Sequence, residues 1–214
     1  MRLYLSSYKL GNSPEKFVEM VKGDRKVAVI NNAQDAYDDP EITQQKLQDE
    51  IVSLKALGFD AQELDLKTYF GKPQELARHL RSYNAVWVRG GNSFVLRRAM
   101  KESGFDVAIK SLLANDQLVY AGYSAALAVL QKDMHGVDIV DDPHELPKGY
   151  PKEVVWDGLG ILNYHVAVHY QSDHPESDAV NQEVEFLKKQ KIPFKTLRDG
   201  EVIVIDGDKE EVLK

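Results

Sequence analysis

A serine lies between an apolar run and an alanine-rich run near the middle of this 214-residue chain. The segment from Leu118 to Ala126 reads Leu-Val-Tyr-Ala-Gly-Tyr-Ser-Ala-Ala. A serine at a sharp turn from a strand into a helix exposes its hydroxyl at the carboxyl edge of a parallel sheet. The pattern therefore predicts that Ser124 is a nucleophile and that the amide of Ala125 can bind an oxyanion. The alternative is that Ser124 only caps the following helix.

A serine hydroxyl needs a base to attack at neutral pH, and the chain contains six histidines. His169 lies near the end of the alternating segment Asn163–Tyr170, where a strand would meet the loop Gln171–Pro175. We favour it as the base, with a purely structural role as the alternative. His165 would share the same strand face, but four strand residues span about 13 Å, so the two rings cannot bind one metal ion. We expect no metal site and no cofactor.

A carboxylate is expected to hold the imidazole in the tautomer that a base requires. Four aspartates follow Ser124 and precede His169, which matches one known chain order of such triads. The residues alone do not choose among Asp133, Asp138, Asp141 and Asp142.

Two glycines follow another apolar run, in the segment Arg89–Ser93. Adjacent glycines let the backbone approach a ligand and direct amide groups towards it. In a parallel sheet this loop would lie at the same edge as the Ser124 turn, and Asn92 would cap the next helix. A phosphate-binding loop is disfavoured because the common glycine-rich phosphate patterns are missing from the sequence. An ordinary glycine turn remains the alternative.

Short apolar segments alternate with longer amphipathic ones through the first half of the chain. Segments such as Ala85–Val88 are apolar on both faces, as expected where helices cover both sides of a parallel sheet. We predict an α/β fold, a three-layer α/β/α sandwich around a mainly parallel doubly wound sheet, in a single domain over residues 1–214. The expected strands are Arg2–Ser6, Lys26–Asn31, Asp60–Leu64, Ala85–Arg89 and Leu118–Gly122, and the expected helices are Ser13–Lys22, Asp39–Leu57, Pro73–Tyr83, Asn92–Glu102 and Phe105–Ala114.

The pattern is looser beyond Gly136. Residues 136–142 and 158–170 are expected to form further strands around a loop rich in proline and glycine. The expected closing elements are a helix at Glu176–Lys189, strands at Phe194–Leu197 and Glu201–Ile205, and a turn at Asp206–Asp208.

The amino-acid composition disfavours or excludes several classes of function. A formal net charge of -7 disfavours nucleic acid as the main partner, because phosphate binding needs clustered cations. The absence of cysteine from the sequence excludes disulfides, thiolate zinc sites and a cysteine nucleophile. We expect a cytoplasmic protein, because the sequence shows neither a signal peptide pattern nor a run of about 18 apolar residues. The sequence makes no prediction of oligomeric state.

Taken in order, these segments resemble the peptidase E family, serine peptidases of the S51 type that include α-aspartyl dipeptidases and, more distantly, cyanophycinases. The segment Arg89–Phe94 is similar to the glycine-glycine-asparagine loop of the family, and Gly122–Ala126 is similar to its G-x-S-A-G elbow. The segment Gly158–Tyr170 resembles the strand that ends in the catalytic histidine. The resemblance begins at Arg2–Ser7 and covers nearly the whole chain.

The resemblance implies a fold like that of class I glutamine amidotransferases, with serine in place of cysteine. By motif position, Ser124 would be the nucleophile and His169 the base. The acid of the family follows the serine at a short interval, which makes Asp138 the nearest candidate, with Asp141 and Asp142 still open. The oxyanion amides would be those of Gly91 and Ala125, and the substrate-binding residues would be Gly90, Asn92 and Tyr123.

Three departures from the family pattern affect the expected function. Ala126 stands where the elbow usually has glycine, and Arg89 stands where a third glycine is common. The aspartyl dipeptidases carry an arginine downstream of the histidine that holds the substrate carboxylate, but residues 170–187 contain no arginine or lysine. We predict hydrolysis of short peptides through an acyl-enzyme, without strict preference for an N-terminal aspartate. The alternatives are hydrolysis of esters or non-peptide amides, and a binding module that lost catalysis.

Overall fold

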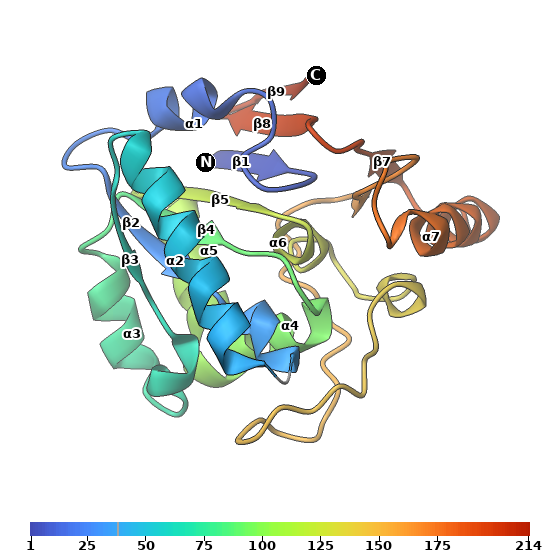
Figure 1. Cartoon of the computed structure of the whole chain (residues 1–214), viewed down its shortest axis with the longest axis horizontal. Coiled ribbons are helices and arrows are strands. Elements are labelled where there is room, and N and C mark those ends of the chain that lie inside the picture. Colours follow the sequence, from blue (N-terminus) through green and yellow to red (C-terminus); the bar gives the residue numbers. More distant parts are fainter. Residues whose placement is uncertain (38) are drawn as a thin grey trace.

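The centre of the molecule is a seven-stranded sheet, seen in a computed structural model that describes residues 1–37 and 39–214 (Figure 1). Its strands are β1 (Arg2–Ser6), β2 (Lys26–Ile30), β3 (Asp60–Glu63), β4 (Ala85–Val88), β5 (Val119–Tyr123), β8 (Val202–Asp206) and β9 (Lys209–Leu213). They lie in the order β3-β2-β4-β5-β1-β8-β9. The first five strands in this order pair in parallel, and β8 and β9 are antiparallel additions at one edge.

Helices cover both faces of the sheet, which explains why its inner strands are apolar throughout. In β1, the side chains of Leu3 and Leu5 pack into one core and that of Tyr4 packs into the other. This alternation is the two-residue period of a strand. The first face is covered by α3 (Pro73–Leu80), α4 (Ser93–Ser103) and α5 (Phe105–Ala114), and the second by α1 (Pro14–Met20) and α2 (Pro40–Ala56). The predicted α/β/α sandwich is confirmed.

The carboxyl ends of three neighbouring strands create the edge at which the site forms. β4, β5 and β1 are adjacent in the sheet and point the same way. The loops that follow them therefore meet at one edge, as expected for ligand sites in open parallel sheets. The last residue of β5 is followed by Ser124 and then by the short helix α6 (Ala125–Ala128).

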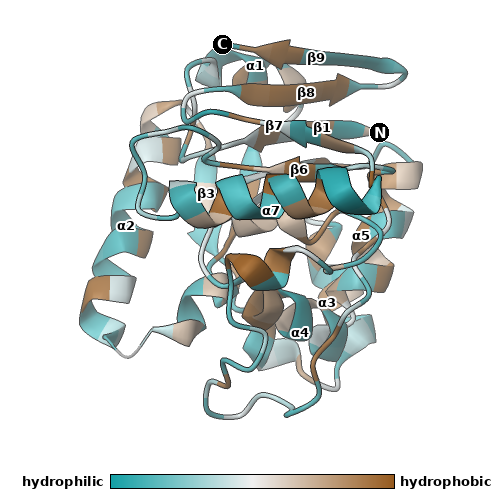
Figure 2. Cartoon of the chain, turned by 90° about the vertical axis from the view of Figure 1, so that its right-hand side faces the viewer, coloured by the Kyte–Doolittle hydropathy of each residue, from teal (hydrophilic) through white to brown (hydrophobic). Residues whose placement is uncertain are grey.

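The C-terminal part of the chain differs most from the prediction. Residues 136–142 do not form a strand, because Val137–Ile139 is a 3₁₀ helix. Within 158–170 only β6 (His165–Ala167) is a strand, and it pairs in parallel with β7 (Phe194–Thr196) outside the main sheet. Backbone groups of residues 158–162 instead bond to loop residues 129–132. The helix α7 (Ser177–Gln190) packs beside this small sheet (Figure 2).

The edge strand β9 was missed by the prediction. Its sequence Lys-Glu-Glu-Val-Leu is mostly charged and exposed, so it lacks the apolar alternation of a half-buried strand. Charged residues on an edge strand discourage pairing with other chains. The expected turn before it is present, with Gly207 at φ 62°. Across residues 1–37 and 39–214, none of the helices combines the length and apolar character needed to cross a bilayer.

Candidate active site

Ser124 occupies a strained turn between β5 and α6. Its backbone has φ 54° and ψ −113°, a region that residues other than glycine rarely adopt. The turn is possible because Gly122 lacks a side chain. A Cβ there would lie 2.2 Å from the carbonyl oxygen of Val88 on the neighbouring strand. The sequence pattern and the backbone therefore agree on a sharp elbow at this serine.

The extra methyl group of Ala126 is accommodated in the core. Ala126 is fully buried, and its Cβ would lie 2.7 Å from a Cβ placed on Gly122. Its carbonyl oxygen accepts a hydrogen bond of 2.8 Å from the hydroxyl of Tyr120. The methyl thus fills the space above Gly122 within the core, and the departure from a glycine at this position leaves the elbow intact.

The glycine pair after β4 lies against the elbow. A Cβ on Gly90 would lie 2.8 Å from the Cβ of Ser124, and a Cβ on Gly91 would lie 2.5 Å from the carbonyl oxygen of Ala33. The carbonyl oxygen of Gly90 accepts a hydrogen bond from Gln34. In a trans peptide the next N–H points opposite to that carbonyl, so Gln34 fixes the direction of the Gly91 amide. Within the described ranges, this amide donates to no protein acceptor.

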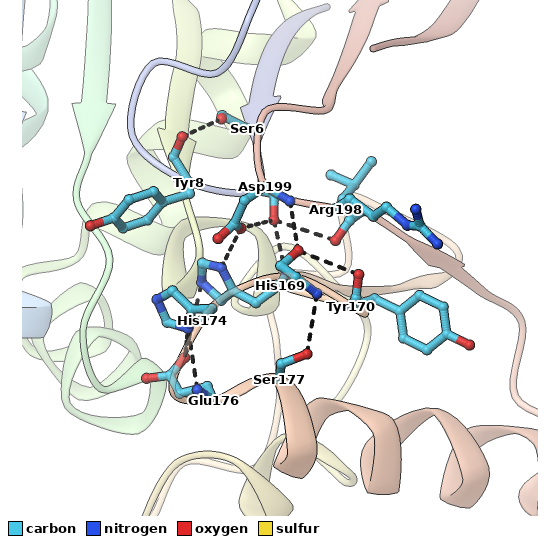
Figure 3. Close-up of polar contacts among 12 residues, drawn as sticks. Ser6, Tyr8, His169, Tyr170, His174, Glu176, Ser177, Arg198 and Asp199 are labelled. Atoms are coloured by element: carbon cyan, nitrogen blue, oxygen red, sulfur yellow. Dashed lines mark hydrogen bonds and ion pairs between the residues drawn. The ribbon is translucent and has the colours of Figure 1, made fainter.

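His169 lies in the turn that follows β6, beside Asp199 (Figure 3), and its side chain is almost fully buried. Its Nδ1 atom is 2.6 Å from Oδ1 of Asp199. Its backbone amide donates to the hydroxyl of Ser7 at 2.9 Å, and this hydroxyl donates to the same carboxylate at 2.9 Å. Ser7 comes directly after β1, so the end of a central strand holds both the histidine and its acid.

The parallel pairing of β6 and β7 brings Asp199 to His169. Ala167 is paired with Thr196. Two bonds continue this pairing beyond the strands, from the amide of Leu197 to the Ala167 carbonyl and from the amide of Tyr170 to the Leu197 carbonyl, both at 2.9 Å. His169 follows its strand by two residues and Asp199 follows its own by three, so the two side chains leave from neighbouring positions.

The expectation that Asp138 is the acid partner is wrong, because the imidazole Nδ1 contacts Asp199 instead. Asp138 accepts from the amide of Gly136, two residues away, at 2.8 Å. The other three aspartates between the serine and the histidine are also engaged elsewhere. Asp133 accepts from the amide of His135, Asp141 from that of Ser93 and Asp142 from that of His144.

The prediction assumed that the acid precedes the histidine along the chain, and this assumption was misleading. Asp199 comes after His169, whereas the four candidate aspartates all precede it. A usable signal was present: Asp199 lies just beyond the expected strand Phe194–Leu197 and before Gly200. A carboxylate just beyond one expected strand is the same kind of signal as the histidine near the end of another.

The electrostatics of His169 suit a proton acceptor. Its Nδ1 donates to the Asp199 carboxylate, so in the neutral ring Nε2 is unprotonated and can accept a proton. Burial lowers the pKa of His169, while the hydrogen bond and charge of Asp199 partly oppose this shift. The imidazole is therefore neutral at pH 7, with the tautomer set by the aspartate.

One pocket of about 630 Å³ collects most of the predicted residues. Asn92 does not belong to its lining, since its side chain caps α4 by accepting from the amides of Phe94 and Val95. Within the described ranges, no hydrogen bond joins the side chains of Ser124 and His169, although both line the pocket. The predicted residues that line it are Gly90, Gly91, Tyr123, Ser124 and His169.

The pocket walls carry both signs of charge. Lys9, Lys46 and Arg89 are the cationic lining residues that the structure describes, and Asp49, Glu50 and Glu176 are the anionic ones. Arg89 is buried beside Glu50, with its Nε atom 3.5 Å from the carboxylate. That carboxylate also accepts from the indole of Trp87 at 2.8 Å. The guanidinium is thus committed to a buried ion pair, and it does not make the pocket strongly positive.

The site combines a serine on a strained elbow, a buried histidine bonded to an aspartate, and a glycine loop at one edge of a parallel sheet. These are the parts of a serine-hydrolase type of site. The model of peptidase family S51 matches residues 6–213, and the chain belongs to this family.

The chain is also similar to several individual proteins. It is 26% identical over 162 residues to the "Probable alpha-aspartyl dipeptidase" of Drosophila melanogaster, covering 73% of this chain and 62% of that protein. It is 28% identical over 120 residues to "Uncharacterized peptidase Lin0382" of Listeria innocua, covering 56% and 54%. The matched region thus spans less than two thirds of the length of these curated relatives.

Solved structures support the fold. The crystal structure of a Listeria monocytogenes protein assigned as a peptidase E superimposes with a TM-score of 0.78 at 21% identity, covering 100% of this chain and 98% of that one. A peptidase from an acI-B1 Actinobacterium gives a TM-score of 0.69 at 14% identity, covering 99% and 86%.

Proposed function

We propose that this chain is a serine peptidase that hydrolyses short peptides, with Ser124 as nucleophile, His169 as base and Asp199 as the acid that orients the imidazole. The observation that carries the proposal is the 2.6 Å contact of Asp199 with His169, a buried histidine that lines the same pocket as Ser124. Membership of a peptidase family supports the same reaction.

The proposed reaction uses each group in turn. Nε2 of His169 takes the proton of the Ser124 hydroxyl while its oxygen attacks the scissile carbonyl. The amides of Gly91 and Ala125 stabilise the resulting oxyanion, and the Asp199 carboxylate stabilises the imidazolium. His169 then protonates the leaving amine, which gives an acyl-enzyme and the first product. Water, deprotonated by the same histidine, releases the acid product and restores the serine.

The hydrogen bond between the serine and the histidine is proposed to form when substrate is bound. Catalytic hydrogen bonds are commonly long or misaligned without substrate and tighten in the complex. Ser124 lines the pocket and is partly exposed, while His169 is held by Asp199 and Ser7. The adjustment that completes the triad is therefore assigned to Ser124 and not to the anchored His169.

The volume of the pocket supports short peptides over long ones as substrates. The charges of its lining argue against strict selection for an acidic side chain. Its volume of about 630 Å³ lies in the range of small-molecule sites. Its mixed charges leave no unopposed cationic cluster among the described lining residues. We propose dipeptide-like substrates, with kcat/KM for N-terminal aspartyl and N-terminal leucyl peptides within about tenfold of each other, because one favourable contact is worth about tenfold.

A substrate panel on the wild-type protein and Ser124→Ala tests the proposal. The panel contains α-aspartyl, β-aspartyl and neutral dipeptides together with simple esters. Peptide cleavage by the wild-type protein that is lost in the folded Ser124→Ala protein is the expected result. Turnover of esters alone would reassign the site to non-peptide hydrolysis, and turnover that survives in the alanine variant would refute the serine mechanism.

The alternative of a binding module that lost catalysis rested on Ala126. The packing of its methyl group within the core, against Gly122, removes the reason to expect a blocked elbow. The retained pairing of His169 with Asp199 also supports catalysis, because a binding role has no need of an oriented base.

A further inference from the structure

A second histidine lies directly on His169. The rings of His169 and His174 are stacked, with centroids 3.7 Å apart and planes inclined by 5° (Figure 3). Oε2 of Glu176 is 3.9 Å from Nε2 of His169 and 4.0 Å from Nδ1 of His174. The three side chains offer two imidazole nitrogens and one carboxylate oxygen within 4.8 Å of one another. The proposed peptidase mechanism uses neither His174 nor Glu176.

We propose that His169, His174 and Glu176 form a zinc-binding site that blocks the base reversibly, so that Zn²⁺ acts as an inhibitor of the enzyme. The two-histidine, one-carboxylate donor set is one that zinc accepts, with a fourth position left to water. The site differs from the His165 and His169 pair that the strand geometry excludes, since His165 contributes no ligand to it.

The surroundings of His169 favour metal binding through Nε2. Asp199 already accepts a hydrogen bond from Nδ1. A carboxylate on the far nitrogen is the usual partner of a zinc-binding histidine, because it fixes the tautomer and makes the ligand nitrogen more basic. Asp199 therefore serves either function of the ring, orienting it as a base or as a ligand.

The ring that must move to close the site is His174. Two stacked rings direct their nitrogen lone pairs along parallel planes, so one ring has to turn before both can face a single ion. His169 is held by Asp199 and Ser7. His174 lies in the loop before α7, and its Nδ1 accepts a single long hydrogen bond of 3.3 Å, from the amide of Glu176. Ligand-to-metal distances of about 2.0–2.2 Å require only this local adjustment.

Zinc at this position would stop the proposed reaction directly. The metal would occupy the Nε2 lone pair that accepts the serine proton, so the base would be unavailable while the ion is bound. All three ligands line the open pocket, which gives the ion access from solvent. The binding claim stands on the ligand geometry alone, and only the inhibition claim rests on the proposed function.

Metal titration of Ser124→Ala tests binding without any need for activity. Calorimetry with Zn²⁺ and absorption spectra with Co²⁺ are expected to show one site per chain. Adding His174→Phe, which keeps a stacked ring but removes the nitrogen ligands, should weaken binding by at least about tenfold. Glu176→Gln should do the same. The control His135→Ala removes a different, exposed histidine–aspartate pair and should leave affinity unchanged. Equal affinities in all four proteins, or no stoichiometric binding, would overturn the site.

Inhibition is then measured on proteins that retain Ser124. Each variant is compared with its own metal-free rate, so effects on basal activity cancel. The Zn²⁺ concentration for half inhibition should rise at least about tenfold in His174→Phe and in Glu176→Gln. Mg²⁺, which prefers oxygen ligands, should not inhibit at the same concentration. Undiminished zinc inhibition in both variants would overturn the proposal. If no protein shows turnover, the peptidase proposal fails while the calorimetry still decides the metal site.

Discussion

Nδ1 of His169 lies 2.6 Å from Oδ1 of Asp199, thirty residues further along the chain. Neither residue belongs to the main sheet, and each follows one strand of the small β6–β7 pair. Ser7, at the end of β1, joins this pair to the main sheet through two hydrogen bonds. His169 and Asp199, the proposed base and its acid, are therefore attached as one unit to the edge where Ser124 lies.

Replacing Asp199 by asparagine should lower kcat by about 10⁴-fold, because the amide favours the wrong imidazole tautomer. The matched control is Asp138→Asn, which alters an aspartate that, within residues 1–37 and 39–214, hydrogen-bonds only to the amide of Gly136. Its kcat should stay within about twofold of wild type, as expected for a change remote from the chemistry. Steady-state kinetics on a dipeptide decide between the two. A larger loss in Asp138→Asn than in Asp199→Asn would contradict the assignment of the acid.

The pH profile of kcat/KM should have an acid limb below pH 6.5. The base acts when its ring is neutral, and burial lowers the pKa of His169 from an ordinary value of about 6.5. Activity should therefore rise as pH increases through this lowered pKa and remain high at neutral pH. Because Asp199 raises the pKa of the ring, Asp199→Asn should move the limb further towards acid. A limb above pH 7 in the wild-type protein would argue against His169 as the base.

Gly91→Ala should reduce kcat by about 10²-fold or more, since a misplaced oxyanion amide costs about that much. The new Cβ would lie 2.5 Å from the carbonyl oxygen of Ala33, and the residue has φ 143°. Gly160→Ala is the control, because Gly160 also has a positive φ but has open space around it. Backbone strain in Gly160→Ala should appear in thermal unfolding, while its kcat should be unchanged. Equal kcat in both variants would remove Gly91 from the oxyanion site.

Arg98 should stabilise the loop of residues 143–153. The buried guanidinium donates to the carbonyls of Pro143, Glu145 and Glu153 at 2.6, 2.7 and 3.0 Å. Arg98→Met would leave these acceptors without their donor and should lower the free energy of unfolding by about 3 kcal/mol. Urea denaturation measures the change. The control is Arg78→Met at an exposed position, which should change the free energy of unfolding by less than about 0.5 kcal/mol. A similar loss of stability in Arg78→Met and Arg98→Met would contradict the role of Arg98 in the loop.

The first half of the fold could be predicted because its local signals agree with one another. Asp39 caps α2 by accepting from the amide of Ile42, and Pro40 occupies the first turn, where its missing N–H costs nothing. Buried strands such as β4 are apolar on both faces. The elbow at Ser124 and the glycine loop follow from these same elements, so the serine half of the site was predictable.

The second half could not be predicted, because its backbone is satisfied by contacts between distant loops. Gly158 lies so close to Gln131 that a Cβ would be 2.0 Å from its carbonyl oxygen. Such a contact between distant loops leaves no periodic pattern in the local sequence. The partner of His169 depends in turn on the register of β6 against β7, and three-residue strands carry too few residues to reveal their pairing. Asn92 was expected both to cap the next helix and to bind substrate, and the structure shows that its side chain oxygen is occupied by capping.

The most direct test of a catalytic Ser124 is covalent capture. The folded protein is incubated with a peptidyl phosphonate that reacts only with activated serines, and its intact mass is measured over time. The wild-type protein should gain one adduct, mapped to Ser124, Ser124→Ala should gain none, and His169→Ala should react at least about 100-fold more slowly. An unlabelled wild-type protein across several such phosphonates, or equal labelling of Ser124→Ala, would contradict the account.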